Sequence, residues 1–249
     1  GSRAEALGGS DMSLSILDSE YRFEGTVSGS NPARSWLNGD VSDSADLTLL
    51  IENGMPRNSM AGFTNFIDLA SEDSGTITTT IRNTTIGDTI GQGIDIEAFD
   101  TSRVTLDVIG STLSNSGAGL LNVLVNDQAV ASSTLTSNTL INPANRAITL
   151  LSKATNSTDN ARVGATLTSN QFQALSGALR ATSDTDDGLA ELRLNMTNNT
   201  SNGLYLLEQL EAPPGTAAIT LFDGGGNSPT QTTSGTIGTS TTTLDINFP

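Results

Sequence analysis

Six residues that could bind a ligand or a metal ion recur at similar intervals, and the first four are 27 residues apart. They are Asp68, Asp95, Asn122, Thr149, Arg180 and Tyr205. If the fold sets residues one interval apart on neighbouring strands, Asp68 and Asp95 lie about 5 Å apart, with Glu97 and Asp100 near them. Such close carboxylates repel unless one is protonated or a cation bridges them. Asp68, Asp95 and Glu97 are therefore candidate Ca²⁺ ligands, and a solvated, screened acidic surface is the alternative.

The elements that would position these residues are short strands that recur along the chain. Apolar patterns of the form Ile77-x-Thr79-x-Ile81 start at residues 47, 77, 104, 131, 163, 190, 217 and 244, so five of the seven intervals are 27 residues. A second series of inward pairs flanks the six candidate residues: Ile67/Leu69, Ile94/Ile96, Leu121/Val123, Ile148/Leu150, Leu179/Ala181 and Leu204/Leu206. Alternation of this kind predicts β-strands with one buried side.

A third apolar column follows turns rich in Asn, Ser and Gly, at Ile86, Leu113, Leu140 and Phe172. Each repeat then has three short strands, and one repeat alone cannot bury its apolar side. Stacked repeats can, because each column continues through its neighbours. We predict an all-β fold, a right-handed parallel β-helix of about eight coils of roughly 27 residues. Asn at the turns suits left-handed backbone and can form a ladder along the stack.

The repeat also predicts the domain organisation. Residues 1–10 are expected to be a tag or a disordered N-terminus, 11–44 a cap or an atypical first coil, and 45–249 the β-helix. Gly1-Ser2 is typical of a pair left by an expression tag, and the strand expected at Leu244–Phe248 suggests that the native chain continues. The two longer intervals predict loops at 54–62 and 153–161, where binding is often located on a rigid scaffold.

The composition excludes several chemistries. The chain of 249 residues has no Cys and no His, which removes disulfides, imidazole or thiolate zinc sites, and Ser-His or Cys-His nucleophiles. Its net charge of −16 disfavours nucleic acid and anionic membranes as partners and favours cations or neutral ligands. No apolar run is long enough to span a membrane as a helix.

Three other residue patterns have plainer interpretations. Outward Thr residues of the first strand resemble the face of some ice-binding proteins, but Asp107, Glu191 and Arg193 interrupt it. The arginines are expected on different faces of the coil, without a single basic stripe. The run Asp184-x-Asp186-Asp187 lacks the later Glu of an EF-hand loop, so an acidic turn is expected there.

The acids and Arg180 resemble the layout of β-helix polysaccharide lyases, in which acids on adjacent coils hold Ca²⁺ and an Arg or Lys takes the proton next to a uronate. Here Arg180 lies three coils beyond Asp95, about 14 Å away on the strand spacing. Proton transfer needs hydrogen-bond reach, so this spacing disfavours a lyase. A carbohydrate-active β-helix, either a lyase or a glycan-binding spike, stays as the alternative function.

The 27-residue coils, the turn Gly91-Gln92-Gly93-Ile94 and the richness in Ser, Thr, Asn and Gly resemble the passenger domains of autotransporter adhesins of Gram-negative bacteria. The resemblance covers about residues 45–249 and is architectural. It implies a non-enzymatic rod, secreted or attached to the outer membrane at the cell surface. Such a rod would bind a cell-surface or matrix ligand, a glycan or a second copy of itself, with no cofactor other than Ca²⁺.

Overall fold

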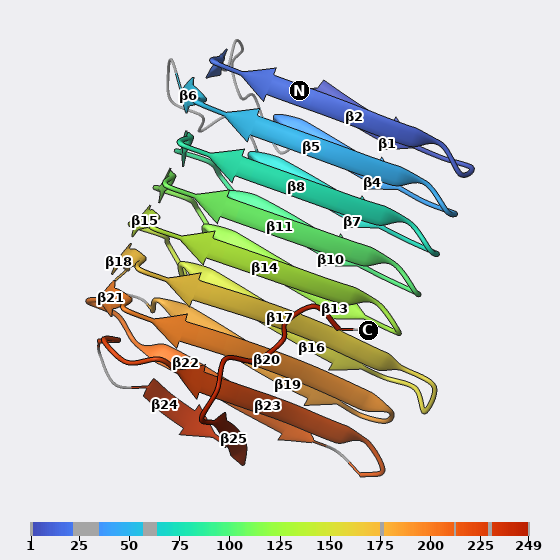
Figure 1. The fold of residues 1–249 in the computed structure, drawn as a ribbon, viewed down its shortest axis with the longest axis vertical. Coiled ribbons are helices and arrows are strands. Elements are labelled where there is room, and N and C mark those ends of the chain that lie inside the picture. The colour runs from blue at the N-terminus through green and yellow to red at the C-terminus, as the bar shows by residue number, and fades with distance from the viewer. Residues whose placement is uncertain are drawn as a thin grey trace.

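The protein is described by a computed structural model that covers residues 2–21, 35–56, 64–174, 177–211, 213–228 and 231–248. Within these residues all regular structure is β, and the chain winds into a right-handed parallel β-helix of about seven turns (Figure 1). The predicted fold class is confirmed, and the predicted coil number is close. Among the described residues there is no helix that could cross a membrane.

Two long parallel sheets form the walls of the solenoid, and the described part of each has nine strands. Sheet A consists of β1 (Ser2–Ala6), β4 (Leu37–Val41), β7 (Ile67–Ser71), β10 (Ile94–Ala98), β13 (Leu121–Asn126), β16 (Ile148–Ala154), β19 (Leu179–Thr185), β22 (Tyr205–Glu211) and β24 (Gln231–Ser234). Sheet B consists of β2 (Asp11–Leu17), β5 (Asp46–Glu52), β8 (Thr76–Arg82), β11 (Arg103–Ile109), β14 (Val130–Thr136), β17 (Asn160–Thr168), β20 (Leu189–Thr197), β23 (Thr216–Asp223) and β25 (Ile237–Ser240).

A short sheet closes the third side of the coils. It consists of β9 (Thr85–Gly87), β12 (Thr112–Ser114), β15 (Thr139–Ile141), β18 (Gln171–Gln173) and β21 (Thr200–Ser201). At the N-terminal end of this side, β3 (Glu20–Tyr21) pairs with β6 (Met55–Pro56). Ile86, Leu113, Leu140 and Phe172 are stacked in register, as the third apolar column predicted.

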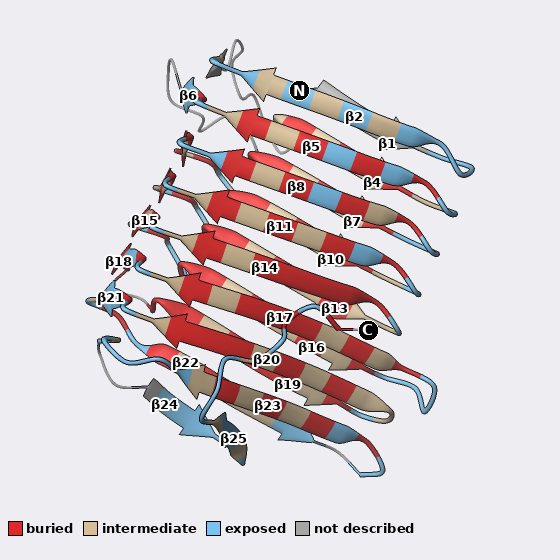
Figure 2. Ribbon diagram, viewed as in Figure 1, coloured by how far each residue is buried: buried red, intermediate tan, exposed pale blue. Residues whose placement is uncertain are grey.

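Alternation along each strand separates the core from the two outer faces. In β10, for example, Ile94, Ile96 and Ala98 are fully buried while Asp95 and Glu97 lie outward. Figure 2 shows the same alternation as bands along the strands of sheet B. The core is one continuous cluster of Ile, Leu, Val and Ala side chains along the axis of the solenoid. Aliphatic side chains of medium size fit this narrow space, so few aromatic residues are needed.

Inside the turn before the short sheet, the buried Asn138, Asn170 and Asn199 and the partly exposed Asn227 form a ladder. The backbone N–H of each of the first three donates to the Oδ1 of the next, over 3.0 Å in every case. Each Nδ2 also donates to a backbone carbonyl oxygen, as Asn170 does to Leu135 over 2.8 Å. The predicted Asn ladder is therefore confirmed, and towards the N-terminus Ser111 and Thr84 take its place.

Sheet B differs from the sequence interpretation at two places. Ala190 pairs with Ala161, so the strand at 190 is displaced by two residues from the expected alignment with Val163. A displacement of two leaves the same side chains pointing inward, and Leu192 and Leu194 are fully buried as expected. The pattern at Leu244–Phe248 is not a further strand: β25 ends the sheet, and residues 244–248 cross its outer face.

The N-terminal residues join the sheets, and of the two predicted loops the structure fully describes only the second. Strand β1 pairs with β4 and β2 pairs with β5, so residues 2–6 and 11–17 extend both sheets by one strand. The loop expected at 54–62 lies mostly outside the described residues. The segment 153–161 is a tight turn, because Asp159 Oδ2 accepts the N–H groups of Thr155 and Asn156 over 2.9 and 2.8 Å. Its extra residues lengthen β16 and β17 and form no protruding loop.

Candidate binding face of sheet A

The outer face of sheet A brings five of the six predicted residues into one column. The strand register places them on successive coils in the order Asp68, Asp95, Asn122, Thr149 and Arg180. All five are partly exposed. The spacing of the sequence repeat therefore predicted the column correctly, because each coil adds one strand to the sheet.

At its N-terminal end the column is a network of carboxylates and neutral donors. Asp68 accepts a hydrogen bond from Ser35 Oγ over 2.9 Å. Asp95 accepts one from Asn122 Nδ2 over 2.8 Å and a second from Asn65 Nδ2 over 3.2 Å. These amide and hydroxyl donors come from neighbouring coils, so they link the stack across the sheet. The expected closeness of Asp68 and Asp95 is realised, since the two residues are paired in register.

The carboxyls of Asp95 and Glu97 are less acidic than usual. Partial burial raises the pKa of Asp95, the hydrogen bond from Asn122 opposes this, and the charge of Asp68 adds to it. Partial burial also raises the pKa of Glu97, with further contributions from the charges of Asp95 and Asp68. The three acids therefore form a repelling group on a half-buried surface.

The calcium expectation does not fit this arrangement well. Among the described residues no three acidic side chains converge closely enough to hold a metal ion. Asp68 Oδ2 and both carboxylate oxygens of Asp95 already accept hydrogen bonds from neutral donors, with which a cation would compete. Calcium binding by Asp68, Asp95 and Glu97 stays a prediction, which titration of the chain with Ca²⁺ under calorimetry would test.

A hollow of about 310 Å³ lies beside the acidic end and is lined by Ser35, Asn38, Thr64 and Asp68. Asn38 belongs to the same column as Asp68 and donates to Asp40 over 3.0 Å. The carboxylate of Asp68 and the amide of Asn38 could accept hydrogen bonds from a ligand hydroxyl or donate to it.

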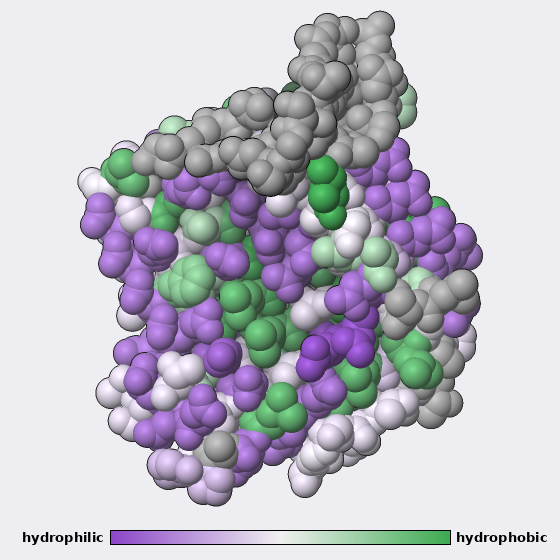
Figure 3. All heavy atoms as spheres, turned by 180° about the vertical axis from the view of Figure 1, so that it is seen from behind, coloured by the Kyte–Doolittle hydropathy of each residue, from purple (hydrophilic) through white to green (hydrophobic). Residues whose placement is uncertain are grey.

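The centre of the face is apolar, which the sequence analysis did not anticipate. Leu124 and Leu151 are paired on adjacent coils and point outward, and both remain partly exposed. Leu206 follows Arg180 in the outward column, and the side chain of Leu210 is 42% exposed. Figure 3 shows this side of the molecule, with apolar side chains near the middle and hydrophilic ones around them. The signal was available, because "NVLV" and "ITLLSK" place Leu at positions that alternate with the core.

At the C-terminal end of the face, Arg180 forms an ion pair with Glu208 on the next coil. Thr182 Oγ1 also donates to Glu208 over 3.3 Å. A shallow hollow of about 130 Å³ lies here, lined by Thr149, Leu151, Arg180, Thr182, Asp184 and Leu210. The guanidinium of Arg180 is thus directed towards Glu208 and away from Asp68 and Asp95. Arg180 lies three coils from Asp95.

Tyr205 does not belong to this face, and its prediction as an outward contact residue was wrong. It pairs with Leu179, so its ring points inward and is fully buried, and the outward position falls to Leu206. The ring packs edge-on against Phe172 with centroids 5.9 Å apart, and its hydroxyl donates to Ser228 O over 3.1 Å. Burial raises the pKa of Tyr205 to about 12. This coil is one residue shorter than 27, which shifts the alternation.

The turns between sheets A and B carry a second column of acids that the sequence analysis missed. Asp43, Asp73, Asp100 and Asp127 all have left-handed backbone, and their spacing follows the strand intervals. Each carboxylate after the first accepts the backbone N–H of the aspartate one coil earlier, over 3.1 to 3.3 Å. These hydrogen bonds stabilise the turns, and Asp100 therefore belongs to the turn and not to the group around Asp95.

Comparisons with known proteins identify no relative. No family model matches the chain, and neither the curated proteins nor the solved structures contain a match. The fold is thus established by the structure itself, and the similarity to autotransporter passengers rests on architecture alone.

Proposed function

We propose that the protein is a secreted or cell-surface β-helix that acts as a non-enzymatic adhesin or structural rod. Its outer face of sheet A would bind a cell-surface or matrix ligand, a glycan or a second copy of the chain. The observation that carries this proposal is the composition of that face. An apolar centre at Leu124 and Leu151 is bordered by hydrogen-bonding groups, which is the usual anatomy of a binding surface.

The mechanism is many modest contacts on a rigid support. The strand pairing fixes the positions of Asp68, Asp95, Asn122 and Thr149 one coil apart, so a ligand finds a preformed array of donors and acceptors. Each contact is weak alone, but several copies of the rod on one surface would add their binding through multivalency. The location outside the cell is inferred from the acidic, Cys-free composition and from the resemblance to exported β-helices.

The test is an attachment assay with matched double variants. Microspheres coated with the chain are presented to one another, to cultured cells and to a glycan array. The face variant carries Asn122→Arg and Thr149→Arg, and the control carries Thr48→Arg and Thr78→Arg on exposed positions of sheet B. Both variants change the net charge equally, and arginine side chains on sheet A would obstruct the face.

We expect the sheet A variant to lose most of its attachment and the sheet B control to keep it. Thermal unfolding of both variants checks that the solenoid is intact. Equal attachment of the two variants, or equal loss in both, would contradict binding through sheet A.

The second candidate is a carbohydrate-active β-helix, and the hollow beside Asp68 together with the raised pKa of Asp95 favours it. A carboxyl that is protonated more readily than usual can act as a general acid. This candidate predicts release of reducing or unsaturated ends from an acidic polysaccharide, with loss of turnover in Asp95→Asn or Arg180→Ala. Such turnover would replace the adhesin proposal.

A further inference from the structure

The C-terminal segment Leu244–Phe248 lies across the outer face of sheet B. After β25 the chain reverses and crosses the strands of sheet B towards the N-terminal end (Figure 1). Residues of four coils lie against it: Asn195 of β20, Gly164 of β17, Ser132 of β14 and Arg103 of β11. This segment has the alternation of a strand, but it buries its apolar side chains on the outside of the solenoid.

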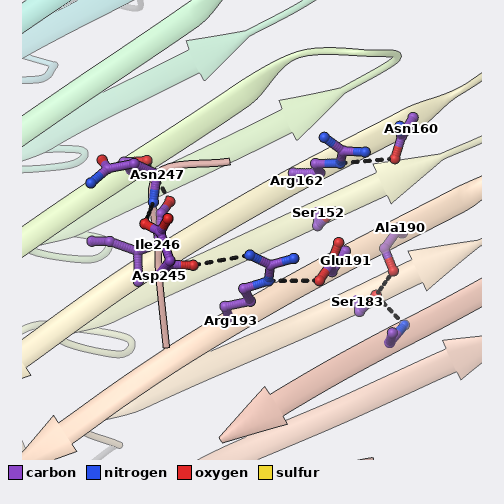
Figure 4. Close-up of polar contacts among 12 residues, drawn as sticks. Ser152, Asn160, Arg162, Ser183, Ala190, Glu191, Arg193, Asp245, Ile246 and Asn247 are labelled. Atoms are coloured by element: carbon purple, nitrogen blue, oxygen red, sulfur yellow. Dashed lines mark hydrogen bonds and ion pairs between the residues drawn. The ribbon is translucent and has the colours of Figure 1, made fainter. Parts of the chain in front are cut away.

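The sheet binds the backbone of the segment through four side chains. Asn195 forms a two-way pair with Leu244, its Nδ2 donating to the carbonyl and its Oδ1 accepting the N–H, both over 2.9 Å. Arg193 donates to Asp245 O over 3.0 Å, as Figure 4 shows. Ser132 donates to Ile246 O over 2.7 Å, and Arg103 donates to Phe248 O over 3.1 Å. Carbonyl groups at four of the five residues are thus recognised.

Two side chains of the segment, Ile246 and Phe248, are buried against the outer face of the sheet. Ile246 is 9% exposed and lies directly on Gly164, where an added Cβ would be 2.5 Å from Ile246 O and 2.7 Å from its Cβ. Phe248 is 3% exposed, and its ring centroid lies 4.3 Å from the guanidinium carbon of Arg193 and 5.7 Å from that of Arg162. Both distances suit cation–π attraction.

Contacts within the sheet position the arginine side chains that bind the segment. Arg193 pairs with Glu191 over 2.7 Å, and Arg162 is held by Asn160 over 3.1 Å (Figure 4). Arg103, Arg162 and Arg193 were expected on different faces, yet all three contact one segment, in a chain with only 11 basic residues. Two glycines stand in the outward column of sheet B, Gly164 on β17 and Gly238 on β25, and Ile246 lies on Gly164. The other positions, from β2 to β23, hold Ser13, Thr48, Thr78, Thr105, Ser132, Arg193 and Thr220.

We propose that this part of sheet B is a binding site for an extended peptide of the pattern Leu-x-Ile-x-Phe, and that it takes the segment 244–248 of a second copy in trans. The polar contacts bind the backbone, and the Gly164 position and the arginine pair select Ile and Phe. Residues 241–243, which connect β25 to the segment, are exposed, so exchange between copies requires a change only in this connection. The site is separate from the sheet A face and does not depend on the function proposed for it.

The test mixes two full-length chains that each lack one half of the interaction. The donor carries Gly164→Val, which blocks its own site and leaves its segment intact. The three atoms nearest to an added Cβ at this position all belong to Ile246, so valine is compatible with the sheet itself. The acceptor carries Ile246→Asp and Phe248→Ala, which release its segment and leave its site open.

We expect sedimentation velocity to detect a one-to-one complex in the mixture and only monomers in each chain alone. A labelled peptide of residues 241–249 should also bind the acceptor, and binding should weaken about tenfold or more when the acceptor carries Gly164→Val. Arg103→Gln in the acceptor is a second variant on an exposed side chain and should weaken peptide binding without affecting the core. An acceptor that unfolds like the unaltered chain but binds neither donor nor peptide would overturn the proposal.

Discussion

Two columns of polar side chains run along this solenoid at the spacing of one coil, and they differ in what surrounds them. The inner column is the ladder Asn138, Asn170, Asn199 and Asn227, whose first three members are at most 1% exposed. The outer column begins with Asp68, Asp95 and Asn122 on sheet A and is partly exposed. Inside, each amide of the ladder has its donors and acceptors satisfied by the neighbouring coils. Outside, the carboxylates repel one another, and their partly exposed oxygens can still accept hydrogen bonds from a ligand.

The inner column should be the more sensitive of the two. In Asn170→Ala, the N–H and Nδ2 of Asn138 and the carbonyl of Leu135 lose partners in a buried turn. We expect a loss of about 3 kcal/mol in the free energy of unfolding, because buried polar groups left unpaired are costly. Urea unfolding monitored by circular dichroism measures the loss.

The chain supplies its own control for this prediction. Ser111 accepts the N–H of Thr84 over 3.1 Å in the equivalent turn, so a hydroxyl can serve as acceptor in the ladder. Asn170→Ser should therefore recover part of the stability lost in Asn170→Ala. If both variants were as stable as the unaltered chain, the ladder would have no role in holding the coils together.

A buried polar group without a partner should have the opposite effect when removed. Thr79 is fully buried between Leu49 and Leu106, and within the described residues its hydroxyl has no hydrogen bond. Thr79→Val keeps the shape and the β-branch, and we expect it to raise the free energy of unfolding by about 1 kcal/mol. The exposed Thr78→Val is the matched control, for which no comparable gain is expected. Destabilisation by Thr79→Val in the same urea assay would mean that the hydroxyl is satisfied.

Removal of an amide side chain from the outer column should lower the free energy of unfolding less than removal of one from the inner column. Asn122 donates one hydrogen bond to Asp95 and is partly exposed, so Asn122→Ala should destabilise the chain by about 0.5 kcal/mol at neutral pH. The same change should raise the pKa of Asp95 further, because that hydrogen bond favours the charged form. An NMR titration of the Asp95 carboxyl follows the second effect. A fall in this pKa would contradict the described contact.

The sequence predicted the strands, the three apolar columns and the Asn ladder because these follow from a period that side-chain alternation makes visible. The prediction for Tyr205 was wrong because its coil is one residue shorter than the repeat. The alternation therefore changes phase there, and Tyr205 points inward. The residues of the outer acidic column were also correctly brought together, since they lie within the four coils of equal length.

The features that the sequence did not predict depend on contacts between distant parts of the chain. Leu244-x-Ile246-x-Phe248 has the pattern of a core strand, but contacts with distant residues hold it on the outer face of sheet B. Gly164 allows its close approach, and Arg103, Ser132, Arg162, Arg193 and Asn195 contact it. The alternation places Leu124 and Leu151 outward, but a pattern alone does not show what an outward apolar residue contacts. Both cases concern surfaces, where hydrophobic alternation carries little information.

The smallest expected effect is a pH-dependent one at Glu97, which lies beside the outer column. The pKa of Glu97 is raised in the folded state, so the folded chain binds this proton more tightly than the unfolded chain does. The associated stability is fully present below the unfolded pKa and is lost as the pH rises through the folded pKa. Glu97→Gln should therefore have little effect in acid and should stabilise the chain by roughly 0.3 kcal/mol at pH 7, a small value because solvent screens a partly exposed group.

Thermal unfolding from acid to neutral pH, in low and high salt, would measure this difference, and Glu72→Gln on an exposed turn is the control. A stabilisation by Glu97→Gln that is equal in acid and at neutral pH would show that charge repulsion is not its cause. A bound cation would reverse the sign at neutral pH, because Glu97→Gln would then remove a ligand. The same measurement with Ca²⁺ added therefore decides whether the outer acids repel one another or hold an ion.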